Sequence, residues 1–445
     1  MTDIMQGLLK EFKLHKSQKR RRAIEKKLDY YTGTSTFQYI VDRFSGDAFN
    51  EVPPYETNFT RKFVNKISRI YTLGAKRTIG SKTQTKLYES LIPTKDVRMK
   101  HSERMTRLLG TIANRVFWKE DRFEYRPVYS FECYFDEDPF TPSAIIYPLL
   151  HNVYDVSDTV ENQWAYWDKS TYKIIDTDGN PVKEEPNPYG VLPFVFTHRE
   201  DQIDEFLVQG ASDIVSCNEQ VNIAMTEMQL GLRFNMFGQP WVNGINADQT
   251  MARAGSNEIL DMGEEGSYNV TSPAGDVTGA IDNIRFQIEL VALNNHLWVQ
   301  WSEQGGEVPS GISLMIKDIE RKEDYFDDIA LWRLYEQDLY KVEKAIADYN
   351  GISLPEDFGV DFIEVEYPKT VQDQILRDNF DLEHNLITEA KIMARENKDL
   401  TIEQAQKVID ENKKVNDIEP EPQIAPEQDL SQNGTIYENN SQNNI

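Results

Sequence analysis

The spacing of hydrophobic residues along the chain predicts a protein rich in helices, with one β-rich stretch in its first half. Apolar residues that recur every three to four positions are typical of helices that bury one face. On this basis helices are expected over residues 1–29, 58–73, 97–120, 204–236, 277–304, 318–350, 370–396 and 402–415. Between about 125 and 197, aromatic and β-branched residues instead indicate short strands, as does the alternation over 362–367. We therefore expect an α+β fold that is mainly helical.

Several short motifs predict where these elements end. Residues 172–175 and Val182 flank the sequence Asp-Thr-Asp-Gly-Asn at 176–180, which is typical of a β-hairpin. The same five residues resemble a calcium loop, but their glycine is at position four rather than six, so we favour a plain turn. Gly33 and Gly351 are expected to end helices. Thr401 and Gln404 form a capping-box pattern.

The helix predicted from residue 277 carries a long apolar stripe. Its members step by 4, 3, 4, 3 and 7 residues: Val277, Ile281, Ile284, Ile288, Val291 and Trp298. This spacing is typical of a helix packed along a neighbouring helix, although an ordinary core helix shows the same stripe. The next segment, 304–313, contains three glycines and a proline, so a flexible loop is expected.

Positive and negative charges are unevenly distributed along the chain, and this bears on which partners the protein can have. The 445 residues carry a net charge of −26. Residues 1–127 hold 27 Lys and Arg against 14 Asp and Glu, a net +13, so the remaining residues, with 21 against 60, carry −39. An acidic surface repels phosphate and is not a groove that grips DNA. It suits a wall along which DNA slides, or it serves solubility alone.

Two other features limit the cellular setting. Cys133 and Cys217 are the only cysteines, so no disulfide framework is expected and a reducing cytosol is the natural environment. No run of 18 apolar residues occurs, and the N-terminus lacks the apolar core of a secretory signal. We expect no membrane partner.

The sequence offers little catalytic chemistry. It contains no phosphate-loop, nucleophile-elbow, HExxH or CxxC motif. The six histidines are scattered, with none three or four residues from another. The run Asp136-Glu137-Asp138 suits a divalent cation, but a solvated turn before Pro139 is the simpler interpretation. The basic run 19–22 is either a phosphate contact or a solvated helix face. We therefore expect a protein that is not an enzyme, with no catalytic residues, no metal site and no cofactor.

Several local motifs occur in a fixed order along residues 25–415. The motifs are Tyr30-Tyr31-Thr32-Gly33 followed by Asn58, Ile67 and Tyr71; Gly210-Ala211-Ser212-Asp213-Ile214 followed by Asn222 and Gly238-Gln239-Pro240; Pro309-Ser310-Gly311-Ile312-Ser313-Leu314; Leu386-Ile387-Thr388-Glu389-Ala390; and Leu400-Thr401-Ile402-Glu403-Gln404-Ala405. Each motif is short, but their shared order, together with the order of the predicted elements, resembles the portal proteins of tailed bacteriophages.

The resemblance implies a portal-type fold with wing, stem, clip and crown, long stem helices and a β-rich wing. The implied divisions are an N-terminal wing over 1–203, a stem helix over 204–237, a clip over 238–276, a second stem helix over 277–303, a tunnel loop over 304–317, a wing helix and strand over 318–369, a crown over 370–416 and a disordered tail over 417–445.

It also implies roles for individual residues. Those of the DNA-facing tunnel loop are Gln304, Gly305, Gly306, Glu307, Val308, Pro309, Ser310 and Lys317. Those of the clip, where a motor or adaptor docks, are Gln239, Trp241, Asn243 and Arg253. Those of the contact between stem helices of neighbouring subunits are Ile281, Ile284, Ile288 and Trp298. The loop departs from a basic DNA contact, because 304–313 contains Glu307 and no cation.

The function implied by the resemblance is a ring, usually of twelve subunits, at one capsid vertex, which conducts double-stranded DNA during packaging and ejection and joins head to tail. The implied partners are other copies of the chain, DNA read without regard to sequence, the terminase large subunit, the major capsid protein with its scaffold, and tail adaptor proteins. Such a protein assembles in the host bacterial cytoplasm and ends in the virion. Two alternatives stay open: another virion protein, such as an adaptor or minor capsid component, or a cation-dependent nuclease that uses residues 136–138.

Overall fold

The computed structural model divides the chain into two compact units, Met1–Glu366 and Tyr367–Ile445. It describes residues 2–34, 36–44, 53–149, 163–202, 204–237, 239–243, 267–271, 277–299, 319–363, 371–397 and 400–416. Helices outnumber strands in residue count and the fold is mixed α+β, as predicted. Among the described residues, no helix has the length and apolar character needed to cross a bilayer.

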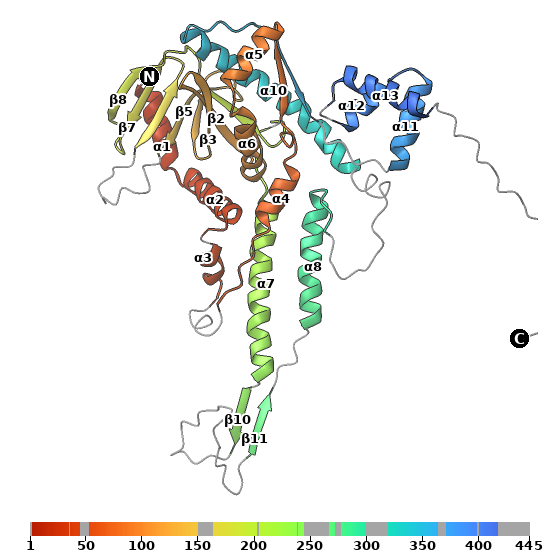
Figure 1. Ribbon diagram of the computed structural model, residues 1–445. Coiled ribbons are helices and arrows are strands. Elements are labelled where there is room, and N and C mark those ends of the chain that lie inside the picture. The colour runs from red at the N-terminus through yellow and green to blue at the C-terminus, as the bar shows by residue number, and fades with distance from the viewer. Residues whose placement is uncertain are drawn as a thin grey trace, which may run out of the picture. The chain divides into compact units, whose positions relative to one another are not determined.

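The first unit begins with helices and continues into sheets (Figure 1). Its early helices are α1 (Thr2–Lys13), α2 (His15–Thr32), α3 (Thr36–Val41), α4 (Thr60–Ile67), α5 (Lys82–Leu91) and α6 (Lys95–Leu109). A three-stranded antiparallel sheet has the order β3 (Arg122–Val128), β2 (Thr111–Lys119), β9 (Phe194–His198). A five-stranded meander follows sequence order: β4 (Glu132–Phe135), β5 (Pro142–Pro148), β6 (Trp164–Asp168), β7 (Thr171–Ile175) and β8 (Pro181–Pro186).

In the part that the structure describes, the rest of the first unit forms three long helices and two small sheets. The helices are α7 (Ser212–Phe237), α8 (Val277–Asn294) and α10 (Ile319–Tyr349). The strands β10 (Gln239–Asn243) and β11 (Ser267–Thr271) pair with each other, and β1 (Ala75–Ile79) pairs with β12 (Phe358–Phe362). The second unit contains α11 (Val371–Glu383), α12 (Glu389–Glu396) and α13 (Ile402–Asn416).

The main core of the first unit forms where α10 packs on β1, α5, α6 and the β2–β3 strands. Trp332, Leu339 and Ile346 of α10 are at most 2% exposed and recur at seven-residue intervals, so one face of the helix is buried. A second core forms under the five-stranded sheet, where Leu8 and Leu9 of α1 pack on Ile146 and Tyr166. The two cores therefore hold α10 and α1 against the sheets on which these helices pack.

The structure confirms several predicted ends. Gly33 adopts a φ of 78° and donates its amide to Asp29, which ends α2. The hairpin at 176–180 is present, with Asp176 Oδ1 accepting from the amides of Asp178 and Asn180. Thr401 and Gln404 bond reciprocally as a capping box should. These motifs are local, which is why sequence alone identified them.

The predicted helix over 1–29 is wrong, because the structure has two helices there. Leu14 is extended, with φ −65° and ψ 150°, and separates α1 from α2. The apolar stripe of α1 lies under the β-meander, whereas α2 packs on α4 and α6. Tertiary packing against two different partners explains the break.

The predicted helix over 97–120 is also wrong in its second half. Helix α6 ends at Leu109, and Ile112 and Val116, which we placed on its stripe, lie in β2. Gly110 has a φ of 100°, and a Cβ there would overlap the carbonyl oxygen of Val208. A side chain is therefore excluded at this residue, and the chain reverses there from helix to strand.

Smaller shifts affect other predicted bounds. Helix α4 covers only 60–67 of the predicted 58–73, and α7 starts at 212 rather than 204. Of the predicted strand at 362–367, Phe362 is the last residue of β12, Ile363 is outside the strand, and 364–367 lie outside the described residues. The predicted helix over 370–396 is two helices, α11 and α12, with Asn385 between them at a φ of 54°. Residues 417–445, predicted as a tail, lie outside the described part.

Candidate functional site

The two helices predicted as a stem, α7 and α8, pack side by side within one chain (Figure 1). Ile284 of α8 is 8% exposed and packs with Cys217 and Val221 of α7. Further along, Ala292 packs with Ala211 and Ile214. These apolar contacts hold the two helices together over most of the length of α8.

Two polar contacts accompany the apolar ones. The Cys217 thiol donates to the carbonyl oxygen of Gln287 at 3.6 Å. Asn295, just beyond α8, donates to Asp213 Oδ2 at 2.9 Å. The apolar contacts therefore set which faces of α7 and α8 meet, and the two hydrogen bonds set the axial position of one helix against the other.

A ladder of polar side chains on α7 holds the extended segment before α4. Asn218 Oδ1 accepts from the amides of Phe59 and Thr60 at 3.0 and 3.1 Å. One turn later, Asn222 Oδ1 accepts from the Thr57 amide at 2.9 Å. Another turn later, Thr226 Oγ1 accepts from the Tyr55 amide at 2.9 Å. The segment before α4 thus lies along α7, whose side chains accept from the backbone amides of Tyr55, Thr57, Phe59 and Thr60.

The outer side of α8 is apolar as well. Phe286, Leu290 and Leu293 step by four and three residues, so they share one face of the helix. Their exposed fractions are 61%, 46% and 61%. A helix that is apolar on opposite faces is normally buried on both. This face therefore marks where α8 is suited to a further packing partner.

The apolar stripe of α8, which was expected to contact a neighbouring subunit, packs in part against α7 of the same chain. Ile284 and Ile288 pack against α7 of the same chain, so their side chains serve the contact within the chain. Ile281 is partly buried, and Trp298 is 68% exposed beyond the end of α8. The assignment of these residues to a contact between subunits stays a prediction, which the packing within the chain does not test. Spacing alone cannot distinguish a partner in the same chain from one in another.

Within the predicted clip, 238–276, the structure describes only 239–243 and 267–271, and these two segments form an antiparallel pair of strands. In β10, Gln239, Trp241 and Asn243 pair with Thr271, Asn269 and Ser267 of β11. The hairpin follows α7 directly and precedes α8 in the chain (Figure 1). Arg253 lies outside the described residues.

The whole predicted tunnel loop lies outside the described residues as well. This covers Gln304, Gly305, Gly306, Glu307, Val308, Pro309, Ser310 and Lys317. Their assignment stays a prediction.

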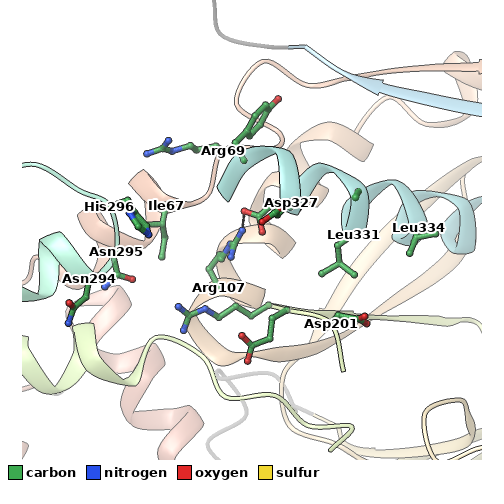
Figure 2. Close-up of a pocket in the computed structure, with 15 residues that line it drawn as sticks. Ile67, Arg69, Arg107, Asp201, Asn294, Asn295, His296, Asp327, Leu331 and Leu334 are labelled. Carbon is green, nitrogen blue, oxygen red and sulfur yellow. Dashed lines mark ion pairs between the residues drawn. The ribbon is translucent and has the colours of Figure 1, made fainter. Parts of the chain in front are cut away.

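A cavity of about 800 Å³ lies where the end of α8 approaches α10 (Figure 2). Arg107 of α6 projects into it and forms an ion pair with Asp328 of α10. Its charged lining is mixed: Arg69, Arg107, Arg199, Glu200, Asp201, Asp327 and Asp328. Because cations and carboxylates both line it, its charge does not point to a ligand of one sign.

The other candidate groups have structural roles where the structure describes them. Asp138 accepts from the Phe140 amide at 2.9 Å and from Thr141 Oγ1 at 2.5 Å, which closes a turn between β4 and β5. Of the basic run at 19–22, Arg20 pairs with Glu132, and Arg21 lies over the Phe12 ring. Within the described residues, no three His, Cys, Asp or Glu side chains are placed to hold a metal ion.

The roles of these residues rest on geometry alone. No protein-family model matches this sequence, and no curated protein shows significant similarity to it.

Proposed function

We propose that this chain is one subunit of a portal-type ring that conducts double-stranded DNA through a capsid vertex. In this proposal α7 and α8 form the stem, β10–β11 is part of the clip, and residues 371–416 belong to the crown. The proposal assigns no catalytic residue and no cofactor. The terminase, the capsid and scaffold proteins and the tail adaptors are its expected partners.

The observation that carries the proposal is the two-sided apolar character of α8. One side packs on α7, and the other presents Phe286, Leu290 and Leu293. A neighbouring copy of the same stem would cover this stripe. Contacts between two different faces of identical subunits repeat around an axis and close into a ring when the rotation permits.

The charge distribution supports a conduit rather than a DNA-gripping enzyme. Residues 128–445 carry a net −39. A bore lined by such residues repels phosphate and therefore provides few binding minima along the DNA path. The virion adaptor and the cation-dependent nuclease are the alternatives, and no described feature favours either of them.

The proposal is tested by substituting the outer face of α8. We expect Leu290→Asp, alone or combined with Phe286→Asp, to block assembly, because each buries a charge at the contact between subunits. Leu87→Asp on α5 is the matched control, since Leu87 and Leu290 are both 46% exposed. Mass measurement of purified protein reads out the assembly, and circular dichroism checks that each variant folds. Unchanged assembly of Leu290→Asp would contradict the proposal.

A further inference from the structure

The outer surfaces of α4 and α6 carry cations that lack acidic partners. The three exposed residues of α4 are Arg61, Lys62 and Lys66, and the helix has no acidic residue. On α6, Lys100 and Arg104 are one turn apart and partly exposed. We call these five residues the α4–α6 basic face.

The carboxylates of α6 do not neutralise this face, because both are used elsewhere. Asp96 pairs with Arg77 at 2.7 Å. Glu103 is buried and accepts from the backbone amides of Ile70 and Tyr71 at 2.9 and 3.1 Å. The negative charges of α6 are therefore engaged with the segment 70–77, whereas Lys100 and Arg104 are partly exposed.

Contacts through two tyrosines join the two helices into one surface. Arg61 lies over the ring of Tyr31, whose hydroxyl donates to Asn65 of α4 at 2.9 Å. Tyr31 and Tyr129 belong to one apolar cluster, and the Tyr129 hydroxyl lies 2.8 Å from Nε2 of His101 on α6. A series of contacts thus runs from Arg61 on α4 through the two tyrosines to His101 on α6, the helix that carries Lys100 and Arg104.

The donors of α4 are the more accessible part of the face. Arg61, Lys62 and Lys66 are exposed, and among the described residues none of the five cations forms an ion pair. Lys100 Nζ donates to the Thr72 carbonyl oxygen at 3.2 Å, and Arg104 Nε is buried with no hydrogen-bond partner, so Arg104 can meet a ligand only through its terminal nitrogens. Burial lowers the pKa of His101, and the charges of Arg104 and Arg98 lower it further. The surroundings of His101 are therefore already electropositive.

We propose that the α4–α6 basic face binds the phosphate backbone of duplex nucleic acid without reading its sequence. Lys100 and Arg104 are separated by about 6 Å along the helix axis, given a rise of about 1.5 Å per residue. One strand of a duplex carries a phosphate about every 3.4 Å along its axis, so the two cations reach phosphates about two nucleotides apart. This goes beyond the proposed function, because a bore that lets DNA slide needs no surface that holds it.

The composition of the face favours nucleic acid over a protein partner. Stable protein interfaces have an apolar, charge-depleted centre. Interfaces with nucleic acid are instead polar and strongly positive. The exposed side of α4 consists only of cations, which matches the second class.

The test measures binding of a short fluorescent DNA duplex to the full-length protein at a series of salt concentrations. We expect the triple variant Arg61→Gln, Lys62→Gln, Lys66→Gln to bind about tenfold or more weakly, with a salt slope smaller by roughly 0.9 per charge removed. A variant of Lys100→Gln with Arg104→Gln tests α6 in the same way. The control, Lys82→Gln, Lys86→Gln, Lys169→Gln, removes the same charge from exposed lysines elsewhere and should bind as the wild type does.

Mass measurement on the same samples separates this inference from the proposed ring. Loss of DNA binding with an unchanged assembly supports the inference, whether that assembly is a ring or a monomer. Wild-type binding by the triple variant would overturn it, as would a wild-type protein that does not bind the duplex at low salt. A triple variant that fails to assemble yet binds DNA normally would also overturn it, and would assign the face to a contact between subunits.

Discussion

Lys95 Nζ lies 2.7 Å from Glu343 Oε1, and both side chains are fully buried. The same nitrogen lies 3.0 Å from Glu336 Oε2, and Arg77 donates to Glu336 from Nε and Nη2 at 2.9 and 2.6 Å. Glu336 and Glu343 are two turns apart on α10, so the network fixes the rotation and the axial position of this helix. Sliding α10 by one turn would leave buried charges unpaired.

We expect Lys95→Met to lower the stability of the first unit by roughly 3–5 kcal/mol, because it leaves two buried carboxylates without their shared cation. Chemical denaturation followed by circular dichroism measures the change. Lys341→Met is the control: Lys341 pairs with Asp338 on the exposed side of the same helix, and such pairs contribute about 0–1 kcal/mol. Equal effects of the two substitutions would refute the role of the network.

The network also predicts loss of stability in acid. Burial raises the pKa of Glu336, but the charges of Lys95 and Arg77, with hydrogen bonds from Arg77 and Tyr71, outweigh it and hold the pKa well below 4.5. The unfolded chain therefore binds a proton at higher pH than the folded one, so this contribution is complete above about pH 4.5 and declines as pH falls further. Denaturation midpoints measured between pH 6 and pH 3 should decline, and Glu336→Gln, whatever its overall cost, should flatten the decline below about pH 4.5.

His198 predicts a further loss of stability in a second pH range, which lies above the one set by Glu336. Burial lowers its pKa from 6.5 to about 4, although Asp201 opposes the shift. The neutral ring contacts Thr111 Oγ1 at 3.0 Å through Nδ1. Because the folded-state pKa is depressed, its contribution is present above about pH 6.5 and is lost progressively down to about pH 4. His198→Asn should weaken the pH dependence in that window, to which His101 also contributes, whereas His15→Asn, at an exposed residue, should leave it unchanged.

The ladder on α7 gives a prediction about local protection. Asn218→Ala removes the acceptor for two backbone amides and the Thr60 hydroxyl, together with a donor to the Thr57 carbonyl. We expect amide hydrogen exchange of Phe59 and Thr60 to accelerate by about tenfold or more, since each net hydrogen bond contributes about 1 kcal/mol. The control is Gln220→Ala: Gln220 is exposed on the same helix, so its substitution should leave the exchange of Phe59 and Thr60 unchanged. Equal protection in both variants would show that packing alone holds the segment.

The sequence predicted those parts of the fold that depend on local patterns. The bounds of α10 are within one residue of the prediction, because a continuous apolar stripe precedes a clear Asn350-Gly351 stop. The break at Leu14 and the change from helix to strand at Gly110 were missed. Both depend on distant partners, the β-meander in the first case and the Val208 carbonyl in the second.

The candidate site was predicted only in outline. Periodicity located α7 and α8, although α8 ends at Asn294 and the predicted helix ran to 304. It could not assign Ile284 and Ile288 to the contact within the chain or Phe286 and Leu290 to the outer face. The ladder of Asn218, Asn222 and Thr226 was also missed. Its four-residue spacing on one helix was the available signal, although polar residues at such spacing are usually solvated.

The measurement that tests the central claim most directly is the mass of the purified full-length protein, combined with negative-stain imaging of the same sample. The account predicts closed rings of many subunits, with an axial opening wide enough for duplex DNA. Dimers with two-fold symmetry, or closed assemblies without a through-going opening, would contradict it.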